Sequence, residues 1–253
     1  MEKIYVLLGF IIGKVFRYRN SVIVQNMSRS FPDESYNEIK KKKEDYYQNL
    51  GRLLFENIIC GSAPLKVTEK SLQLLSDLQK ENRHIILLLG HYGNWEATNQ
   101  LHDITGLKVQ VLYKPIKNIF FNKLMIRRRT KHGVKLINYS NSLRTLARQK
   151  DCHLTLFIAD QFTNGRGLSV NFLNQKTHVF NGAENIAKYL NAYVGYAEII
   201  PNSNFGWQLS INTISNAAGN SIEGDISQSY IKELEKSIKK DPSLWLWSHK
   251  RWK

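Results

Sequence analysis

The sequence contains only two cysteines, Cys60 and Cys152, among its 253 residues. Two thiols cannot cross-link a chain of this length, which excludes a disulfide-stabilised scaffold and favours reduced thiols in a protein that faces the cytosol. No apolar run approaches the roughly 20 residues that a membrane-spanning helix needs. With 42% hydrophobic and 23% charged residues, the chain is also no disordered polymer, and it is long enough to bury a large core.

Several motifs of known chemistry are missing as well. The chain has no G-x-S-x-G nucleophile elbow, no H-E-x-x-H or C-x-x-C pair and no P-loop. Its seven histidines are scattered, so a metal-dependent hydrolase is not expected, and we expect neither a metal nor a cofactor. Cys152 begins an apolar run and is interpreted as a core thiol.

The N-terminus carries the longest apolar stretch, from Ile4 to Ile12, followed by Lys14, Arg17 and Arg19. Nine residues are too few to cross a bilayer, and no convincing cleavage site for a signal peptide follows. Two interpretations stay open: a helix lying in the membrane interface, or an amphipathic helix packed on the core. We assign residues 1–65 to a helical, membrane-associating segment and 66–253 to an α/β domain, the two packed as one unit.

The remaining pattern alternates strands and helices. Ser35 and Glu38 form a capping box that predicts a helix over 35–60, and a second helix is expected over 69–80. Strands are expected at 84–89, 109–113, 134–137, 153–158, 193–200 and 207–211. Further helices are expected at 94–104, 118–131, 141–149, 182–191 and 225–240. This order predicts an α/β fold with a mostly parallel central sheet flanked by helices, and ligands bind beyond the carboxyl ends of such strands.

At that place stands the run His91-Tyr92-Gly93-Asn94-Trp95-Glu96. Five helical residues rotate about 500°, so His91 and Glu96 cannot share a helix face. They can meet if His91 stays in the turn and Glu96 lies in the first turn of the helix that follows. A histidine oriented by a carboxylate is a general base, and we expect Glu96 to reach back to the His91 imidazole. Because no protein nucleophile accompanies it, the base would deprotonate a hydroxyl of the substrate, which then attacks an activated acyl group.

The same run resembles the H-x4-D/E motif of bacterial lysophospholipid-type acyltransferases, specifically the late lipid A acyltransferases that transfer lauroyl or myristoyl chains. Other parts of the chain resemble that family in the same order. They are Arg19–Glu56, Tyr113-Lys114-Pro115 with the arginine-rich segment after it, Asp160-Gln161, Asn181-Gly182-Ala183, and the tail Trp245–Lys253. The family's proline before the Asp-Gln pair is replaced by Ala159, and its Y-R-P arginine by Lys114.

The resemblance implies transfer of a fatty acyl chain from acyl carrier protein or coenzyme A to a hydroxyl of a lipid A precursor or related glycolipid. No acyl-enzyme would form. It gives His91 as the base, Glu96 as its partner and Arg129 as the oxyanion-stabilising cation. Substrate-binding roles fall on Tyr113, Lys114, Arg127, Arg128, Asp160 and Gln161. The expected location is the cytoplasmic face of the inner membrane, with peripheral attachment.

Charge is strongly one-sided: 36 Lys and Arg stand against 21 Asp and Glu, a formal net charge of +15. Residues 104–150 contain Lys and Arg but no acid, which indicates an anionic partner. Anionic membrane lipids, glycolipid phosphates with an acidic carrier protein, and nucleic acid are the candidates. Nucleic acid has no recognisable motif here and is not expected. A catalytically inactive membrane-surface protein is the other alternative.

Overall fold

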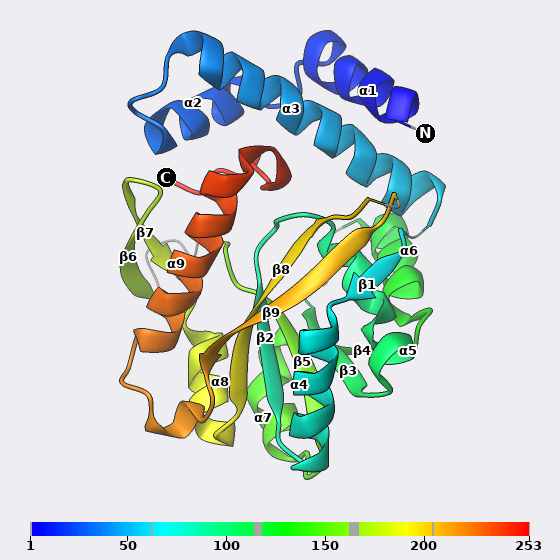
Figure 1. Ribbon diagram of the computed structural model, residues 1–253, viewed down its shortest axis with the longest axis vertical. Coiled ribbons are helices and arrows are strands. Elements are labelled where there is room, and N and C mark those ends of the chain that lie inside the picture. Colours follow the sequence, from blue (N-terminus) through cyan, green and yellow to red (C-terminus); the bar gives the residue numbers. More distant parts are fainter. Residues whose placement is uncertain (1, 62, 114–117, 162–166, 204, 253) are drawn as a thin grey trace.

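The computed structural model describes residues 2–61, 63–113, 118–161, 167–203 and 205–252, apart from the side chains of Glu2 and Phe121. Its centre is a seven-stranded sheet in the order β1-β9-β8-β2-β5-β3-β4 (Figure 1). The strands are β1 (Leu65–Val67), β2 (Ile85–Leu89), β3 (Lys108–Tyr113), β4 (Lys135–Asn138), β5 (His153–Ile158), β8 (Tyr193–Pro201) and β9 (Trp207–Ser215). All neighbouring pairs are parallel except β8 and β9, so the predicted mostly parallel α/β fold is confirmed.

The exception at β8 and β9 has a local cause. The two strands are joined by a short loop in which the Asn202 backbone N–H donates to the Gly206 carbonyl and the Gly206 N–H donates to Asn202 Oδ1. A connection this short can only join antiparallel strands, because a parallel pair needs a crossover of a dozen or more residues. β9 and its parallel neighbour β1 therefore run against the other five strands.

Helices cover the sheet and also extend beyond it (Figure 1). The α-helices are α1 (Glu2–Phe10), α2 (Asn20–Ser30), α3 (Tyr36–Leu54), α4 (Glu69–Lys80), α5 (Leu101–Thr105), α6 (Ile119–Thr130), α7 (Ser142–Ala147), α8 (Gly182–Leu190) and α9 (Asp225–Lys240). Shorter helical turns are η1 (Ile11–Val15), η2 (Phe55–Ile59), η3 (Trp95–Gln100), η4 (Tyr139–Asn141), η5 (Ala218–Asn220) and η6 (Pro242–Leu244). The capping box of Ser35 and Glu38 is present at the start of α3, as predicted.

A two-stranded hairpin, β6 (Leu168–Phe172) and β7 (Gln175–Val179), was not anticipated. Its turn residues Leu173 and Asn174 both have positive φ angles, of 49° and 62°. Two-residue hairpin turns with positive φ angles usually contain Asn-Gly or Asp-Gly. Because Leu173 occupies the first position of this turn, the sequence did not predict it.

The N-terminal helix α1 lies beside α3 at one end of the molecule (Figure 1). A Cβ atom at Gly51 of α3 would stand 2.6 Å from the Gly9 nitrogen and the Tyr5 carbonyl oxygen of α1, so the two backbones pass in direct contact. The other side of α1 leaves Leu7 58% exposed and Phe10 56% exposed. The helix thus packs on α3 with its glycine face and exposes apolar side chains on its other side. Its contact with a membrane interface stays a prediction.

Among the described residues, no helix combines the length and hydropathy required of a transmembrane span. The helices before β1 contact the rest of the chain at several places. In α2, Asn26 Nδ2 donates to the carbonyls of Trp247 and His249 at 2.8 and 2.9 Å, and in α3, Arg52 Nη2 donates to the Gly206 carbonyl at 3.1 Å. The division into segments 1–65 and 66–253 stays a prediction.

Candidate active site

The turn that follows β2 carries His91, and two backbone contacts with the C-terminal segment fix it. The Leu246 N–H donates to the His91 carbonyl at 3.0 Å, and the Gly93 N–H donates to the Leu244 carbonyl at 3.0 Å. Gly93 has φ +64°, and a Cβ there would collide with the Ile199 carbonyl oxygen. Glycine is therefore required at this position by both conformation and space. Leu246 belongs to the tail singled out in the sequence, so this part of the tail supports the turn.

Asp160 is the carboxylate that holds the His91 side chain. It follows β5, the strand paired in parallel with β2, so the carboxyl ends of the two strands bring the residues together. Asp160 Oδ1 lies 2.6 Å from His91 Nδ1, while Oδ2 accepts the His91 backbone N–H and the Trp245 Nε1–H, both at 2.9 Å. The Asp160 side chain is 3% exposed and the His91 side chain 15% exposed.

The buried pair shifts the pKa of each partner. Burial alone lowers the pKa of the His91 imidazole, but the charge of Asp160 and the hydrogen bond to it outweigh burial, so this pKa is raised. Burial alone raises the pKa of the Asp160 carboxyl, but His91 and the Trp245 indole hold that pKa well below its usual range. Asp160 is therefore ionised, and it favours a proton on the neighbouring Nδ1.

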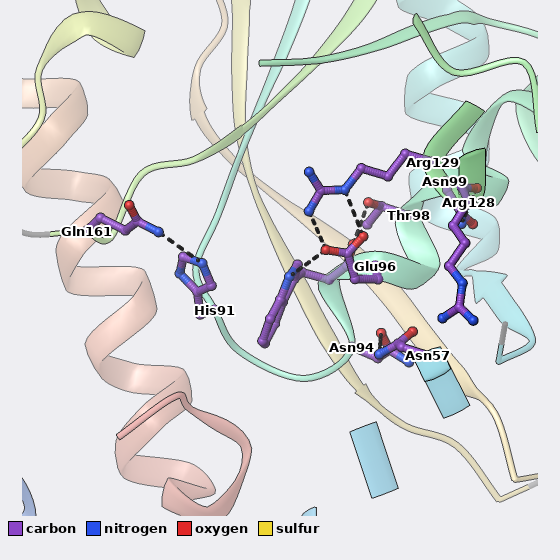
Figure 2. Close-up of polar contacts among 10 residues, drawn as sticks. Asn57, His91, Asn94, Glu96, Thr98, Asn99, Arg128, Arg129 and Gln161 are labelled. Atoms are coloured by element: carbon purple, nitrogen blue, oxygen red, sulfur yellow. Dashed lines mark hydrogen bonds and ion pairs between the residues drawn. The ribbon is translucent and has the colours of Figure 1, made fainter. Parts of the chain in front are cut away.

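The opposite ring nitrogen of His91 faces Gln161. Gln161 Nε2 lies 3.4 Å from His91 Nε2, and the Gln161 side chain is exposed (Figure 2). With the Nδ1 proton donated to Asp160, Nε2 of the neutral ring carries a lone pair toward the accessible side of the site. This is the tautomer that a general base acting through Nε2 requires.

The prediction that Glu96 contacts the His91 imidazole is wrong. Glu96 does lie in the first turn of η3, but its carboxylate pairs with Arg129 of α6 (Figure 2). Arg129 Nε donates to Glu96 Oε2 at 2.9 Å, and Arg129 Nη2 donates to Glu96 Oε1. Trp95 stands against both groups, with its ring 4.9 Å from the His91 ring and its Nε1–H donating to Glu96 Oε1 at 3.2 Å. Glu96 therefore orients the arginine, and Asp160 orients the histidine.

Burial and pairing also act on Arg129. Burial alone lowers the pKa of its guanidinium, but the hydrogen bonds and charge of Glu96 outweigh burial and raise it. The Arg129 side chain is 19% exposed and the Glu96 side chain 15% exposed, so the pair is shielded without being sealed. A fixed cation is thus linked through Glu96 to Trp95, whose ring packs against the imidazole.

A cavity of about 20 Å³ lies beside this ion pair. Its walls are aliphatic side chains from the ends of the central strands, and its polar rim includes Glu96 and Arg129. The full lining is Leu89, Trp95, Glu96, Thr98, Asn99, Val111, Arg129, Val134, Leu156 and Ile158. A cavity of this size holds about one water molecule, so it is a small, mostly apolar recess beside the ion pair.

The other residues predicted to bind substrate lie in different environments. Tyr113 is buried at the end of β3, and its hydroxyl donates to Asn122 Oδ1 of α6. Arg127 is exposed on α6, whereas Arg128 Nη2 donates to the Ile58 carbonyl at 2.8 Å and thereby holds η2. Lys114 lies outside the described residues. In the described part of the chain, no cluster of three His, Cys, Asp or Glu side chains is placed to bind a metal ion.

Sequence reasoning placed Asp160 in the substrate pocket and missed its contact with His91. The signal was present, since Asp160 directly follows a predicted strand just as His91 does. Asn94 was missed too, although it lies midway in the same motif. It is fully buried, with Nδ2 donating to Glu56 at 2.9 Å and Oδ1 accepting from Asn57 at 3.1 Å.

Comparison with known proteins shows which family the chain belongs to. The sequence profile of a family described as "Bacterial lipid A biosynthesis acyltransferase" matches residues 1–253. Two curated relatives are each 22% identical over 255 residues, covering 97% of this chain and 82% of the relative. One is the "Lipid A biosynthesis palmitoleoyltransferase" of Escherichia coli (strain K12), and the other is the "Lipid A biosynthesis acyltransferase" of Shigella flexneri.

Proposed function

Because the chain belongs to the bacterial lipid A biosynthesis acyltransferase family and is thus an acyltransferase, we propose that it moves a fatty acyl chain from a thioester to a hydroxyl of a lipid A precursor or related glycolipid. The observation that supports this most is the geometry of His91. Its Nδ1 lies 2.6 Å from a buried carboxylate, and its Nε2 is turned toward the accessible side.

In the proposed step, His91 Nε2 takes the proton of the acceptor hydroxyl while that oxygen attacks the thioester carbonyl carbon. A tetrahedral intermediate forms, the carbon–sulfur bond then breaks, and the thiol leaves with the proton returned by the imidazolium. Asp160 stabilises the imidazolium between the two transfers. No bond to the protein forms, so the reaction needs both substrates bound together.

Arg129 is proposed to stabilise the oxyanion of that intermediate. Glu96 occupies Nε and Nη2 of the guanidinium, which fixes its plane and leaves Nη1 as the donor aimed elsewhere. Preorganised donors of this kind are worth several kcal/mol when water is excluded. Glu96 therefore remains part of the proposed machinery, as the residue that positions Arg129.

The acyl chain is proposed to lie against the apolar side chains beside the ion pair. Aliphatic walls from Leu89, Val111 and Ile158 exclude water from a hydrocarbon, and the rim at Arg129 is where the thioester carbonyl would then lie. The donor is an acyl thioester of acyl carrier protein or coenzyme A. Both carry the chain on the same pantetheine arm, so the apolar side chains do not distinguish them.

Membrane association is proposed to be peripheral, at the cytoplasmic face of the inner membrane. The outer side of α1 exposes Leu7 and Phe10, and the exposed Arg17 follows as a cation for anionic head groups. Burying apolar side chains in the interface contributes about 25 cal/mol per Å². Each nearby Lys or Arg adds about 1 kcal/mol at an anionic surface. Anionic lipids are therefore the expected partners of this end of the molecule.

The cationic stretch 104–150 suits a phosphorylated acceptor. Arg127 is exposed on α6, the helix that also carries Arg129, so a phosphate bound there would lie near the proposed oxyanion site. An aminolipid or a lysophospholipid acceptor would use the same proton abstraction.

The test is mass spectrometry of the lipids formed when the purified protein is given acyl carrier protein or coenzyme A thioesters with a lipid A precursor. The proposal predicts a product heavier than the precursor by one acyl chain. If the lipid A precursor gains no acyl chain but a lysophospholipid or an aminolipid does, the acceptor belongs to that lipid class instead. No acylation of any lipid would overturn the proposal.

A further inference from the structure

The π-helical turn η2 joins the N-terminal helices to the turn of residues 91–96. Glu56 lies in this turn and is 4% exposed. Its Oε1 accepts from Arg52 Nε at 2.6 Å, while its Oε2 accepts from Trp207 Nε1 at 2.7 Å and Asn94 Nδ2 at 2.9 Å. Both carboxylate oxygens are thus occupied, and one of the donors belongs to the site.

Asn94 is held from both ends by consecutive residues of η2. Besides the contact with Glu56, its Oδ1 accepts from Asn57 Nδ2 at 3.1 Å (Figure 2). Asn94 is the residue before η3, and its carbonyl accepts the Ala97 N–H at 3.0 Å. The position of the Asn94 side chain therefore sets where η3 begins, and with it the place of Glu96.

A second contact ties η2 to the other half of the ion pair. The Ile58 carbonyl accepts from Arg128 Nη2 at 2.8 Å, and Arg128 directly precedes Arg129. Residues 56–58 thus bind both elements whose side chains form the Glu96–Arg129 pair. Single-turn π insertions in helices occur often at functional sites, and this one is anchored to the site on two sides.

We infer that Glu56 is a positioning residue of this acyltransferase: through Asn94 it holds the turn from His91 to Glu96 in the geometry that the reaction needs. The inference rests on the proposed function for its effect on rate. Its structural part, the ordering of residues 91–100, does not depend on what the protein catalyses.

Glu184 offers a matched control for a merely structural carboxylate. It is 1% exposed and also accepts three donors, the backbone N–H groups of Gly224 and Ser227 and the Ser227 hydroxyl. Those donors all lie at the start of α9. Losing one of its hydrogen bonds should lower stability and leave the turn at 91–96 ordered.

The experiment compares Glu56→Gln with Glu184→Gln by hydrogen exchange and by acyl-transfer kinetics. Glutamine keeps the shape, but its N–H₂ meets a donor in either orientation. It faces Arg52 Nε at the Oε1 position, or both Trp207 Nε1 and Asn94 Nδ2 at the Oε2 position. We expect faster exchange over residues 91–100 and a fall in kcat of about tenfold to a hundredfold in Glu56→Gln alone, with KM for the donor little changed. The double variant Glu56→Gln with Asn94→Asp restores a donor facing an acceptor, and should recover part of kcat.

Unchanged exchange over 91–100 in Glu56→Gln would overturn the inference, and so would faster exchange with an unaltered kcat. If Glu56→Gln does not fold, Asn57→Ala decides, because it removes only the bond to Asn94 Oδ1 and should give the same changes at smaller size. If the unsubstituted protein transfers no acyl chain, the proposed function fails, while the exchange result still decides whether Glu56 orders the turn.

Discussion

The Nδ1 atom of His91 lies 2.6 Å from Oδ1 of Asp160, although 68 residues separate the two along the chain. The contact arises because β2 and β5 are parallel neighbours, and each ends two residues before its functional side chain. The other carboxylate oxygen, Oδ2, accepts hydrogen bonds from Trp245 Nε1–H and the His91 backbone N–H. A carboxylate with three donors cannot rotate freely, so the imidazole that it binds is fixed as well.

Replacing Asp160 by Asn should slow acyl transfer strongly. The amide carries no charge to stabilise the imidazolium, and it can present an N–H₂ to Nδ1 and so favour the wrong tautomer. We expect kcat to fall by about 10²-fold or more, as measured by acyl transfer under saturating substrates. Asp151→Asn is the matched control, since Asp151 is exposed and pairs only with Lys108 in the described part of the chain. Equal rates in the two variants would remove Asp160 from the mechanism.

The rate should depend on pH through His91. A general base must be neutral, so kcat/KM should rise with pH and level off above the pKa of His91. Since Asp160 raises this pKa, the inflection should lie above the ordinary value of about 6.5. In Asp160→Asn, the charge of Asp160 no longer opposes burial and only the weaker effect of Glu96 remains, so the inflection should move to lower pH. A profile of kcat/KM against pH for both proteins checks the direction, and an upward movement would contradict it.

Arg129→Lys should impair the reaction while keeping the positive charge. Lysine cannot reproduce the two-pronged contact with Glu96, so the donor aimed at the oxyanion loses its fixed direction. We expect kcat to drop by about 10²-fold with a smaller change in KM. Arg29→Lys, at an exposed position of α2 outside the cationic stretch, should leave both constants unchanged. A purely structural role of Arg129 would appear instead as a lower melting temperature with normal kcat per folded molecule.

Membrane binding should depend on the outer side of α1. Replacing Leu7 and Phe10 together by Ser removes two exposed apolar side chains, and should weaken binding to vesicles by about tenfold to a hundredfold. Ile222→Ser changes a 73% exposed side chain elsewhere and serves as the control. Sedimentation with vesicles that contain or lack phosphatidylglycerol measures the effect. Unchanged binding in the double variant would assign the membrane contact to another surface.

Much of the fold could be predicted from local pattern. The helix expected over 69–80 matches α4, and the strand at 153–158 matches β5, because each has regular periodicity and clear boundaries. The hairpin at β6 and β7 was missed since its turn contains no glycine. The three-residue strand β1 is too short to show any period.

The sequence predicted which residues form the site, but it did not predict which of them contact each other. His91, Glu96, Arg129 and Asp160 were all named, yet Glu96 was assigned to the histidine because the two lie close in sequence. The order of strands decides the true partners, and sequence alone did not reveal that β2 and β5 are neighbours. The role of Glu56 could not be found either, since it depends on where the end of α3 lies relative to Asn94.

The most direct test of the mechanism is acyl transfer by His91→Ala, measured by mass spectrometry of the lipid product under single-turnover conditions. Circular dichroism and vesicle binding confirm beforehand that the variant is folded and reaches its substrate. The account predicts a rate reduced by about 10²- to 10⁴-fold, the contribution of a well-placed general base. A rate equal to that of the unsubstituted protein would show that another group removes the proton.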